Sequence, residues 1–600
     1  MKISELCLDL STLREGYLDH SFAVSEIIRE VLRRINEDDP KIWISVDTES
    51  NLLKMATELE DKDPTDLPLY GIPFAVKDNI DVANLATTAA CPDFKYFAEK
   101  DATVVDLLRT AGAIPIGKAN LDQFATGLVG VRSPYGVPGN AFDADYIPGG
   151  SSSGSAVSVA LGQVSFALGT DTAGSGRVPA CFNNLIGLKP TRGLLSARGV
   201  VPACRSLDCV SIFALNASDA QRVLEVARKF DDQDPFSRPN PELLDTSKLV
   251  DKQGLVFGIP QPTQLHFFGN EDYQNLYLQA VKRLESLGYQ SKVIDLEPFL
   301  QVAKLLYEGP WVAERYWAIR DLIESNPEAL HPTTRAVIEK GDQFSAVDTF
   351  NAIYKLNTLK QLADQVLEEI DFIATPTAGT HYTIAELESD PIELNSNLGY
   401  YTNFMNLLDL SAIAVPTAFT AKKMPFGVTL FAPAFHDEKL LAIAYRLQKA
   451  SELPLGATQT KRYPPLQPTK YPSYSILVCG AHMSGLPLNH QLTDKGASLG
   501  KRCKTAAKYR LYALPNTTPP KPGMARDEES GVSIDVEVWD LPYSQWSAFL
   551  QEIPSPLGIG TVELEDGSNA KGFICEPYAI KEAKDVSEFG SWRNYINSLS

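Results

Sequence analysis

The chain has 600 residues, 44% of them hydrophobic, and its 75 acidic against 55 basic side chains give a formal charge of −20. That length exceeds what one hydrophobic core usually organises, so we expect one large domain and one smaller domain. The negative charge argues against nucleic acid or an anionic membrane as the main partner.

The chain carries no sign of export or membrane insertion. Residues 1–10 include acidic side chains and lack the basic segment and long apolar run of a signal peptide or anchor. No stretch approaches the roughly 20 uninterrupted apolar residues that span a bilayer. The eight cysteines are scattered and form no CxxC pair, so we expect reduced, mostly buried thiols. We therefore predict a cytoplasmic protein with no metal and no cofactor.

The first part of the chain alternates helix and strand patterns. Apolar residues recur at helical spacing over 24–35, with Ser25 placed to cap that helix. Short apolar runs at 72–76 and 113–116 predict strands, and 102–111 predicts a helix between them. This alternation favours an α/β sandwich around a largely buried sheet.

Further along, the small apolar run 156–162 ends at a glycine and predicts a buried helix. Ser151 would then lie at or just before the N-terminus of that helix, where free N–H groups and the dipole favour negative charge. Residues 254–259 predict another strand, and residues 271–287 another helix.

Composition divides the chain near its last quarter. Residues 456–474 are rich in proline, which is typical of an extended linker. We place the large domain at 1–455 and a small α+β domain at 475–600, where 532–538 predicts a strand and 582–599 a final helix.

Two serines and one lysine suggest a hydrolase that needs neither histidine nor metal. Ser151 lies in the glycine-serine run 149–155, Ser175 follows a second glycine-rich segment, and Lys77 ends an apolar run. A lysine can activate a serine only when neutral, and a pKa of about 7 to 8 corresponds to roughly 4 kcal/mol of environment favouring the amine. The alternatives are a Lys77 ammonium paired with Asp78 or another carboxylate, and a glycine-serine run that is only a turn or linker.

Together these features resemble the amidase signature family, whose catalytic triad is Ser–cis-Ser–Lys. The glycine-serine loop 149–154 and the Asp-x-x-Gly-Ser-x-Arg segment 171–177 carry the resemblance, which covers roughly residues 20–450. It implies an α/β/α sandwich around a large mixed sheet. It also implies that Ser175 is the nucleophile, Ser151 the bridging serine in a cis peptide and Lys77 the base. The oxyanion would be bound by backbone N–H groups of Thr172, Ala173, Gly174 and Ser175.

One departure from the common pattern narrows the resemblance. Ala173 and Gly176 stand where many members have glycine and isoleucine, and this variant, with the segment 201–211, is similar to allophanate hydrolases. Tyr307 and Arg315 match the tyrosine and arginine with which those enzymes hold the substrate carboxylate. A guanidinium fork suits a planar carboxylate, and a phenol adds a neutral donor.

The chain between these two residues predicts how they meet. Gly309 and Pro310 should break any helix there, so we expect Tyr307 to approach from a turn and Arg315 from the next helix. The alternative is that Tyr307 only packs and Arg315 pairs with Glu308 or Glu314 at the surface.

The resemblance implies a two-step reaction. Ser175 would attack the terminal amide carbon of allophanate, with ammonia as the leaving group, and water would hydrolyse the acyl-enzyme to N-carboxycarbamate. That product would break down to ammonia and carbon dioxide or bicarbonate. We expect Arg177, Arg205 and Asp208 to be scaffold.

Residues from about 475 onward resemble the C-terminal domain of allophanate hydrolases, which is similar to the γ-glutamylcyclotransferase fold. The segment 478–489 carries this likeness, and its His482 is a candidate acid or base for decarboxylation of the first product. An assembly role for this domain is the competing interpretation.

The rivals are an amidase of other specificity, an amidotransferase-like subunit that supplies ammonia, and a binding protein without turnover. We expect a small-molecule substrate and a homodimer, with a urea carboxylase as a partner in the pathway. Urea carboxylation and triazine breakdown both remain open as the upstream pathway.

Overall fold

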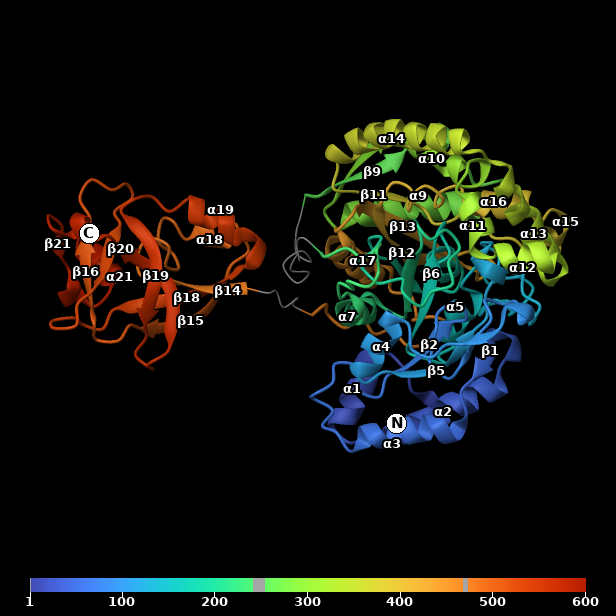
Figure 1. The fold of residues 1–600 in the computed structure, drawn as a ribbon, viewed down its shortest axis with the longest axis horizontal. Helices are drawn as coiled ribbons and strands as arrows, with labels where there is room; N and C mark the ends of the chain where they lie inside the picture. Colours follow the sequence, from blue (N-terminus) through green and yellow to red (C-terminus); the bar gives the residue numbers. More distant parts are fainter. Residues whose placement is uncertain (1, 241–253, 468–472, 600) are drawn as a thin grey trace. The chain divides into compact units, whose positions relative to one another are not determined.

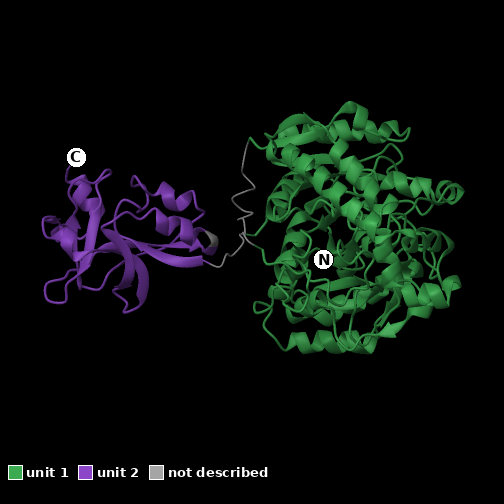
Figure 2. Cartoon of the chain, turned by 45° about the horizontal axis from the view of Figure 1, so that its top comes forward, with its two compact units in different colours: residues 1–240, 246–468 green, residues 241–245, 469–600 purple. Residues whose placement is uncertain are grey.

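The computed structural model describes residues 2–240, 254–467 and 473–599. They form two compact units, one of residues 2–240 with 254–467 and the other of residues 473–599, coloured separately in Figure 2. Each unit has its own β-sheets and its own hydrophobic core. Within these ranges, no helix combines the length and the apolar character that a membrane crossing requires.

The first unit is built on a mixed sheet of eleven strands (Figure 1). In spatial order these are β1 (Trp43–Val46), β5 (Ile114–Ala119), β2 (Pro73–Lys77), β6 (Phe166–Asp171), β8 (Cys209–Ala214), β7 (Ile186–Lys189), β12 (Leu410–Phe419), β13 (Pro425–Pro433), β11 (Phe372–Pro376), β9 (Val256–Pro260) and β10 (Gln290–Ile294). A separate hairpin pairs β3 (Ala86–Thr87) with β4 (Tyr96–Phe97). The predicted α/β architecture around a large mixed sheet is confirmed.

Helices cover this sheet. They are α1 (Leu10–Leu18), α2 (Val24–Glu37), α3 (Glu49–Glu60), α4 (Thr103–Thr110), α5 (Ser153–Ala160), α6 (Val178–Phe182), α7 (Ala217–Ala227), α9 (Glu271–Ser286), α10 (Glu297–Glu308), α11 (Val312–Ala318), α12 (Arg320–Ser325), α13 (Pro332–Ile338), α14 (Ala346–Glu368), α15 (Ile384–Ser389), α16 (Glu393–Leu398) and α17 (Asp437–Ser451). In Figure 1, α2 and α3 lie at the β5 end of the sheet, and α10 and α14 at the β9 end. Helix α5 packs against β2 and β6, which places its N-terminus near the ends of these strands.

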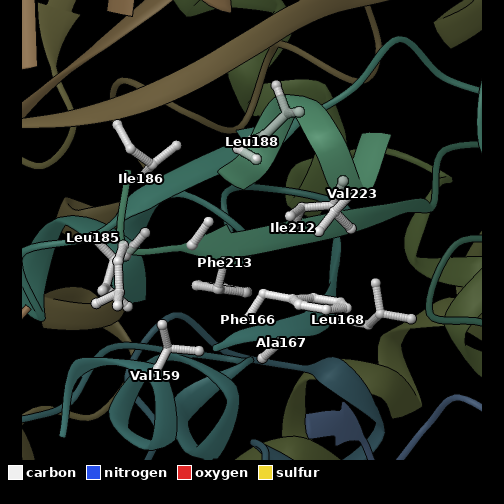
Figure 3. Packing of buried hydrophobic residues seen from close by; sticks show 14 of the residues in the cluster. Val159, Phe166, Ala167, Leu168, Leu185, Ile186, Leu188, Ile212, Phe213 and Val223 are labelled. Carbon is white, nitrogen blue, oxygen red and sulfur yellow. The ribbon is translucent and has the colours of Figure 1, made fainter. Parts of the chain in front are cut away.

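The strands in the middle of the sheet are fully buried. Strand β6 is buried along its whole length, as are β2, β7 and β8. Figure 3 shows Phe166 and Leu168 of β6 among Ile212 and Phe213 of β8 and Val159 of α5. Strands buried on both faces carry continuous apolar runs, which is why the sequence pattern located them.

Most expected elements are present with small shifts. The predicted strands 72–76 and 113–116 are β2 and β5, and the helix between them is α4. The predicted buried helix is α5, which begins at Ser153, so Ser151 does lie just before a helix N-terminus. The later strand and helix, at 254–259 and 271–287, are β9 and α9.

Two local predictions were wrong. Ser25 does not cap α2, because the helix begins at Val24 and the Glu26 carboxylate accepts the backbone N–H of Ala23 at 2.8 Å. The helix predicted over 582–599 is confined to 592–597. The chain before it first pairs as a strand and then turns at Gly590, whose φ is 61°.

The proline-rich segment lies partly on the first unit. Asn184 Nδ2 donates to the carbonyl oxygens of Pro454 and Gly456 at 2.7 and 2.8 Å, and Ser218 Oγ donates to that of Pro465 at 3.1 Å. Residues of this segment up to Pro465 therefore contact the first unit. Residues 468–472 of the predicted linker lie outside the described residues, and the domain boundaries at 455 and 475 stay predictions.

The second unit has a five-stranded and a three-stranded sheet. The larger sheet runs β15 (Ser498–Lys504), β18 (Asp535–Pro542), β14 (Ser473–Val478), β20 (Asn569–Cys575) and β19 (Leu557–Glu563), and the smaller runs β17 (Pro522–Arg526), β16 (Tyr509–Ala513) and β21 (Lys584–Asp585). Its helices are α18 (His490–Thr493), α19 (Trp546–Gln551), α20 (Pro577–Ile580) and α21 (Trp592–Asn597). The likeness to the γ-glutamylcyclotransferase fold stays a prediction.

Candidate active site

The three predicted catalytic side chains come from elements that meet at one edge of the large sheet. Strands β2 and β6 are parallel neighbours, so their carboxyl ends lie at the same edge. Lys77 is the last residue of β2, and the segment of Ser175 follows the end of β6. Ser151 lies two residues before the start of α5, which packs on both strands.

Lys77 is fully buried and lies beside two hydroxyl groups. Its Nζ is 2.8 Å from Ser151 Oγ and 2.8 Å from Thr170 Oγ1. Burial lowers the pKa of Lys77 to about 7, against the opposing effect of nearby carboxylates. The alternative pairing with Asp78 is not what the structure shows, because Asp78 pairs with Lys118 at 3.2 Å.

Both serines are buried at this edge. The Gly150–Ser151 peptide bond is cis, and the Ser151 carbonyl accepts the backbone N–H of Asp122 at 3.0 Å. Ser175 Oγ donates to the carbonyl oxygen of Gly127 at 3.5 Å, and 3% of this residue is exposed. No hydrogen bond joins the two serine hydroxyls among the described residues.

The turn before Ser175 presents backbone N–H groups next to it. Of the four predicted oxyanion donors, the N–H of Gly174 donates to Asp171 Oδ1 at 2.9 Å. Within the described part of the chain, the N–H groups of Thr172, Ala173 and Ser175 have no hydrogen-bond partner. Three of the four predicted donors are therefore not used by hydrogen bonds within the described part of the chain.

A buried ion pair holds this turn. The Arg177 guanidinium donates to both carboxylate oxygens of Asp171, at 2.8 and 2.9 Å, and both side chains are fully buried. Although burial opposes its charge, the neighbouring Arg177 keeps the pKa of Asp171 below its usual value. Arg177 thus acts as scaffold for the turn that carries Ser175.

Asp208 contacts the same turn through Thr172. It accepts a hydrogen bond from Thr172 Oγ1 and the backbone N–H of Ala203 at 2.8 Å. Burial raises the pKa of this carboxyl to about 6. Asp208 also lines a cavity of about 880 Å³ that includes Trp317 and Arg205.

Tyr307 and Arg315 lie together, and Arg315 is buried. Tyr307 is in the last turn of α10, so its predicted place in a turn was wrong, whereas Arg315 is on the next helix, α11, as expected. Arg315 Nη2 donates to Tyr307 Oη at 3.4 Å, and its Nη1 donates to Thr126 Oγ1 at 3.0 Å. Glu314 instead accepts the backbone N–H of Ser206 at 2.8 Å.

Among the residues that the structure describes, the buried Arg315 guanidinium forms no ion pair with an acidic side chain. Arg315 is 2% exposed, and it makes no ion pair with a carboxylate among the described residues. Its Nε also has no hydrogen-bond partner there. A buried cation is normally paired, so this group is available to an anionic ligand. Tyr307 also lines a cavity of about 90 Å³, together with Gly127, Arg132 and Lys340.

Three contributors were missed from sequence: Thr170, which contacts Lys77, and Asp122 and Gly127, which contact the serines. Asp122 had a usable signal, because it follows β5, a parallel neighbour of β2 whose carboxyl end lies at the same edge. Gly127 had none, since it acts through a carbonyl oxygen that every residue carries.

His482 belongs to the second unit and lines a cavity of about 220 Å³ there, with Lys521 and Glu552. Its Nε2 is 2.8 Å from Gln491 Oε1, and its ring stacks on that of Phe573 with centroids 5.0 Å apart. Burial lowers the pKa of His482. A largely neutral imidazole in a cavity is compatible with a role as a base.

Comparisons with known proteins agree with this geometry. Residues 26–441 match the Amidase family, and residues 474–597 match the allophanate hydrolase C-terminal domain. Proteins called urea amidolyase from Lachancea kluyveri and Saccharomyces cerevisiae are each 45% identical, over 94% and 93% of this chain. The chain spans 31% of the length of each of these relatives.

Solved structures extend the comparison. The structure of Kluyveromyces lactis allophanate hydrolase is 41% identical, with a TM-score of 0.81 over 98% of this chain and 99% of that one. A serine-to-alanine variant of the same enzyme gives a TM-score of 0.83 over the same shares. The chain belongs to the amidase family and carries an allophanate hydrolase C-terminal domain.

Proposed function

We propose that this chain hydrolyses allophanate at the site formed by Lys77, Ser151 and Ser175. The observation that carries the proposal is the buried Arg315, which has no carboxylate partner among the described residues and lies in the same unit as a buried lysine–serine pair. An amide substrate that also bears a carboxylate would satisfy both features. Allophanate, a small urea-like amide with one carboxylate, fits that description, and the likeness to an allophanate hydrolase structure supports it.

In the first step, neutral Lys77 accepts a proton from Ser151 while Ser151 accepts one from Ser175. The Ser175 oxygen then bonds to the terminal amide carbon of allophanate. The 2.8 Å separation of Lys77 Nζ and Ser151 Oγ supports this relay, as does the pKa of Lys77 of about 7. When the tetrahedral intermediate collapses, the C–N bond breaks and the relayed proton leaves with ammonia.

The oxyanion of that intermediate is bound by the N–H groups of Thr172, Ala173 and Ser175. These groups have no other partner among the described residues, so they need no rearrangement to donate. Gly174 has a different role in this proposal. Its N–H donates to Asp171 and so holds the turn in place. For the three N–H groups that bind the oxyanion, loss of one donor typically lowers kcat by about 10²-fold or more.

Arg315 and Tyr307 bind the carboxylate of allophanate. The guanidinium supplies its unpartnered Nε and one of its Nη groups, and the phenol adds a further donor. In the second step, water attacks the acyl-enzyme, with the same lysine–serine relay taking its proton. The products are N-carboxycarbamate and free Ser175.

His482 is our candidate for the next step, the loss of carbon dioxide from N-carboxycarbamate. Its cavity also holds Lys521, a cation that suits an anionic ligand. The competing role for this domain is assembly, and we keep the predicted homodimer and a urea carboxylase partner as proposals. The urea amidolyase relatives, of which this chain spans 31%, support a link to urea breakdown.

The test is ammonia release from allophanate, urea, malonamate and simple uncharged amides, measured for the wild type and for Ser175→Ala. We expect turnover of allophanate by the wild type and none above background by the variant. An amidase of other specificity would prefer a different amide. An ammonia-supplying subunit would act on glutamine with its partner, and a binding protein would release no ammonia from any of them.

A further inference from the structure

The chain after β5 touches both serines of the site. The backbone N–H of Asp122 donates to the carbonyl of Ser151 at 3.0 Å. Five residues later, the carbonyl of Gly127 accepts the Ser175 hydroxyl at 3.5 Å. One short segment, 122–132, therefore holds the two residues whose hydroxyls must exchange a proton.

The same segment also holds the arginine of the site. Arg315 Nη1 donates to the carbonyl of Ala125 at 3.3 Å and to Thr126 Oγ1 at 3.0 Å. The backbone φ angles of Phe124 and Ala125 are 50° and 51°, values that residues other than glycine rarely adopt. A segment with such a backbone needs other contacts to hold it.

The carboxylate of Asp122 supplies those contacts. Its Oδ2 accepts the backbone N–H groups of Val129 and Gly130 at 3.2 and 2.9 Å, and its Oδ1 accepts that of Arg132 at 3.0 Å. The side chain is fully buried. Three backbone N–H groups are thus tied to one carboxylate, which closes the segment into a loop.

This carboxylate also lies directly against the backbone before Ser151. A Cβ atom at Gly150 would be 2.1 Å from Asp122 Oδ2, and a Cβ at Gly127 would be 2.7 Å from the same oxygen. Both positions therefore require glycine for a close approach. Asp122 Oδ2 therefore lies close to both Gly150, which precedes Ser151, and Gly127, whose carbonyl accepts the Ser175 hydroxyl.

We propose that Asp122 is a positioning residue that sets Ser151 relative to Ser175 and joins both to the carboxylate-binding Arg315. This inference rests on the proposed function, because it assumes the roles given there to the two serines. Asp122 itself touches no reacting atom in this scheme. It acts through the backbone of Gly150 and through the loop that it closes.

Charge gives the proposal a second readout. The negative charge of Asp122 favours the protonated form of Lys77, as do those of Asp208 and Asp171, whereas Arg315 disfavours it. The Asp122 carboxylate also interacts electrostatically with the side chains of Arg132 and His331. Removing the Asp122 charge should lower the pKa of Lys77 further, so more of this lysine is neutral at acidic pH.

The experiment compares Asp122→Asn with a matched control, Asp143→Asn, in the full chain. Asp143 is an exposed carboxylate that also accepts a backbone N–H, from Asp145 at 3.0 Å. Turnover of allophanate and of biuret, its uncharged amide analogue, would be followed against pH. The rate at which a fluorophosphonate probe phosphonylates Ser175, with release of fluoride, measures the nucleophile without any substrate.

We expect Asp122→Asn to lower kcat and the labelling rate by about 10²-fold, because misplacing a reacting group by about 1 Å has that effect. KM should rise for allophanate and not for biuret, since the loop also holds Arg315. The acid limb of the pH profile should move to lower pH. Asp143→Asn should match the wild type in every readout.

Asp122→Glu separates charge from position. It keeps the negative charge, so its acid limb should stay with the wild type, while its longer side chain displaces Gly150 and slows labelling. This variant decides the matter if Asp122→Asn does not fold. The proposal would be overturned if the Asn variant were labelled at the wild-type rate. It would also be overturned if that variant were labelled slowly but kept its acid limb and had a lowered Tm. Labelling of the Glu variant at the wild-type rate would contradict it as well. If Ser175→Ala were labelled and active, the proposed function would fail instead.

Discussion

Lys77 Nζ lies 2.8 Å from Ser151 Oγ, and both side chains are fully buried. An ammonium in this position is desolvated, which is why its pKa falls to about 7. The neutral amine that results has one serine hydroxyl and one threonine hydroxyl within hydrogen-bond distance, and no carboxylate of the described residues is bonded to it. The chemistry of the site follows from this pair.

Ser151→Ala should remove the relay and leave substrate binding in place. We expect kcat to fall by about 10²- to 10⁴-fold with little change in KM, because the loss is one of proton transfer. Ser155→Ala is the matched control, since Ser155 lies in α5, the helix that follows Ser151, and its buried hydroxyl donates to the Leu168 carbonyl at 3.0 Å. Steady-state ammonia release measures both variants. A Ser151→Ala enzyme with wild-type kcat would rule out the relay.

Arg315→Gln should weaken binding of the substrate carboxylate. Hydrogen bonds to charged groups contribute about 1.5–3 kcal/mol, so KM for allophanate should rise by about 10- to 100-fold. KM for an uncharged amide such as biuret should not rise. If KM rose equally for both amides, Arg315 would be holding the site together and not reading the carboxylate.

Arg177→Met should destabilise the first unit. It leaves the Asp171 carboxylate buried without its cation, and breaking such a pair lowers the free energy of unfolding by about 3–5 kcal/mol. Arg320→Met removes an exposed ion pair with Glu324 and should change stability little. Urea unfolding followed by circular dichroism compares the two. Equal stability of both variants would contradict a structural role for Arg177.

His482→Gln should slow only the decarboxylation step that we assign to the second unit. The second unit has a core of its own, so we expect this variant to fold and to release the first ammonia from allophanate at the wild-type rate. Carbon dioxide release should lag behind it. Simultaneous assays of ammonia and carbon dioxide in the first seconds test this. Unchanged carbon dioxide release would favour the assembly role.

The sequence was most informative where one segment carries both the chemistry and the fold. Lys77 ends one strand that is fully buried, the segment of Ser175 follows another, and Ser151 precedes a helix of small residues. Motif and pattern therefore point to the same sites. Asp122 was missed because its effect depends on backbone N–H groups up to ten residues away. The terminal helix is shorter than predicted because it begins only after Gly590, whose backbone is left-handed.

The central claim is that a neutral Lys77 starts the reaction, and the pH dependence of kcat/KM for allophanate tests it most directly. Lys77 is inactive when protonated, so kcat/KM should fall below an apparent pKa near the value of about 7 that burial gives this lysine. Lys77→Arg, which stays charged, should be inactive at every pH. A wild-type profile that stays flat to about two units below pH 7, or an active Lys77→Arg enzyme, would contradict the account.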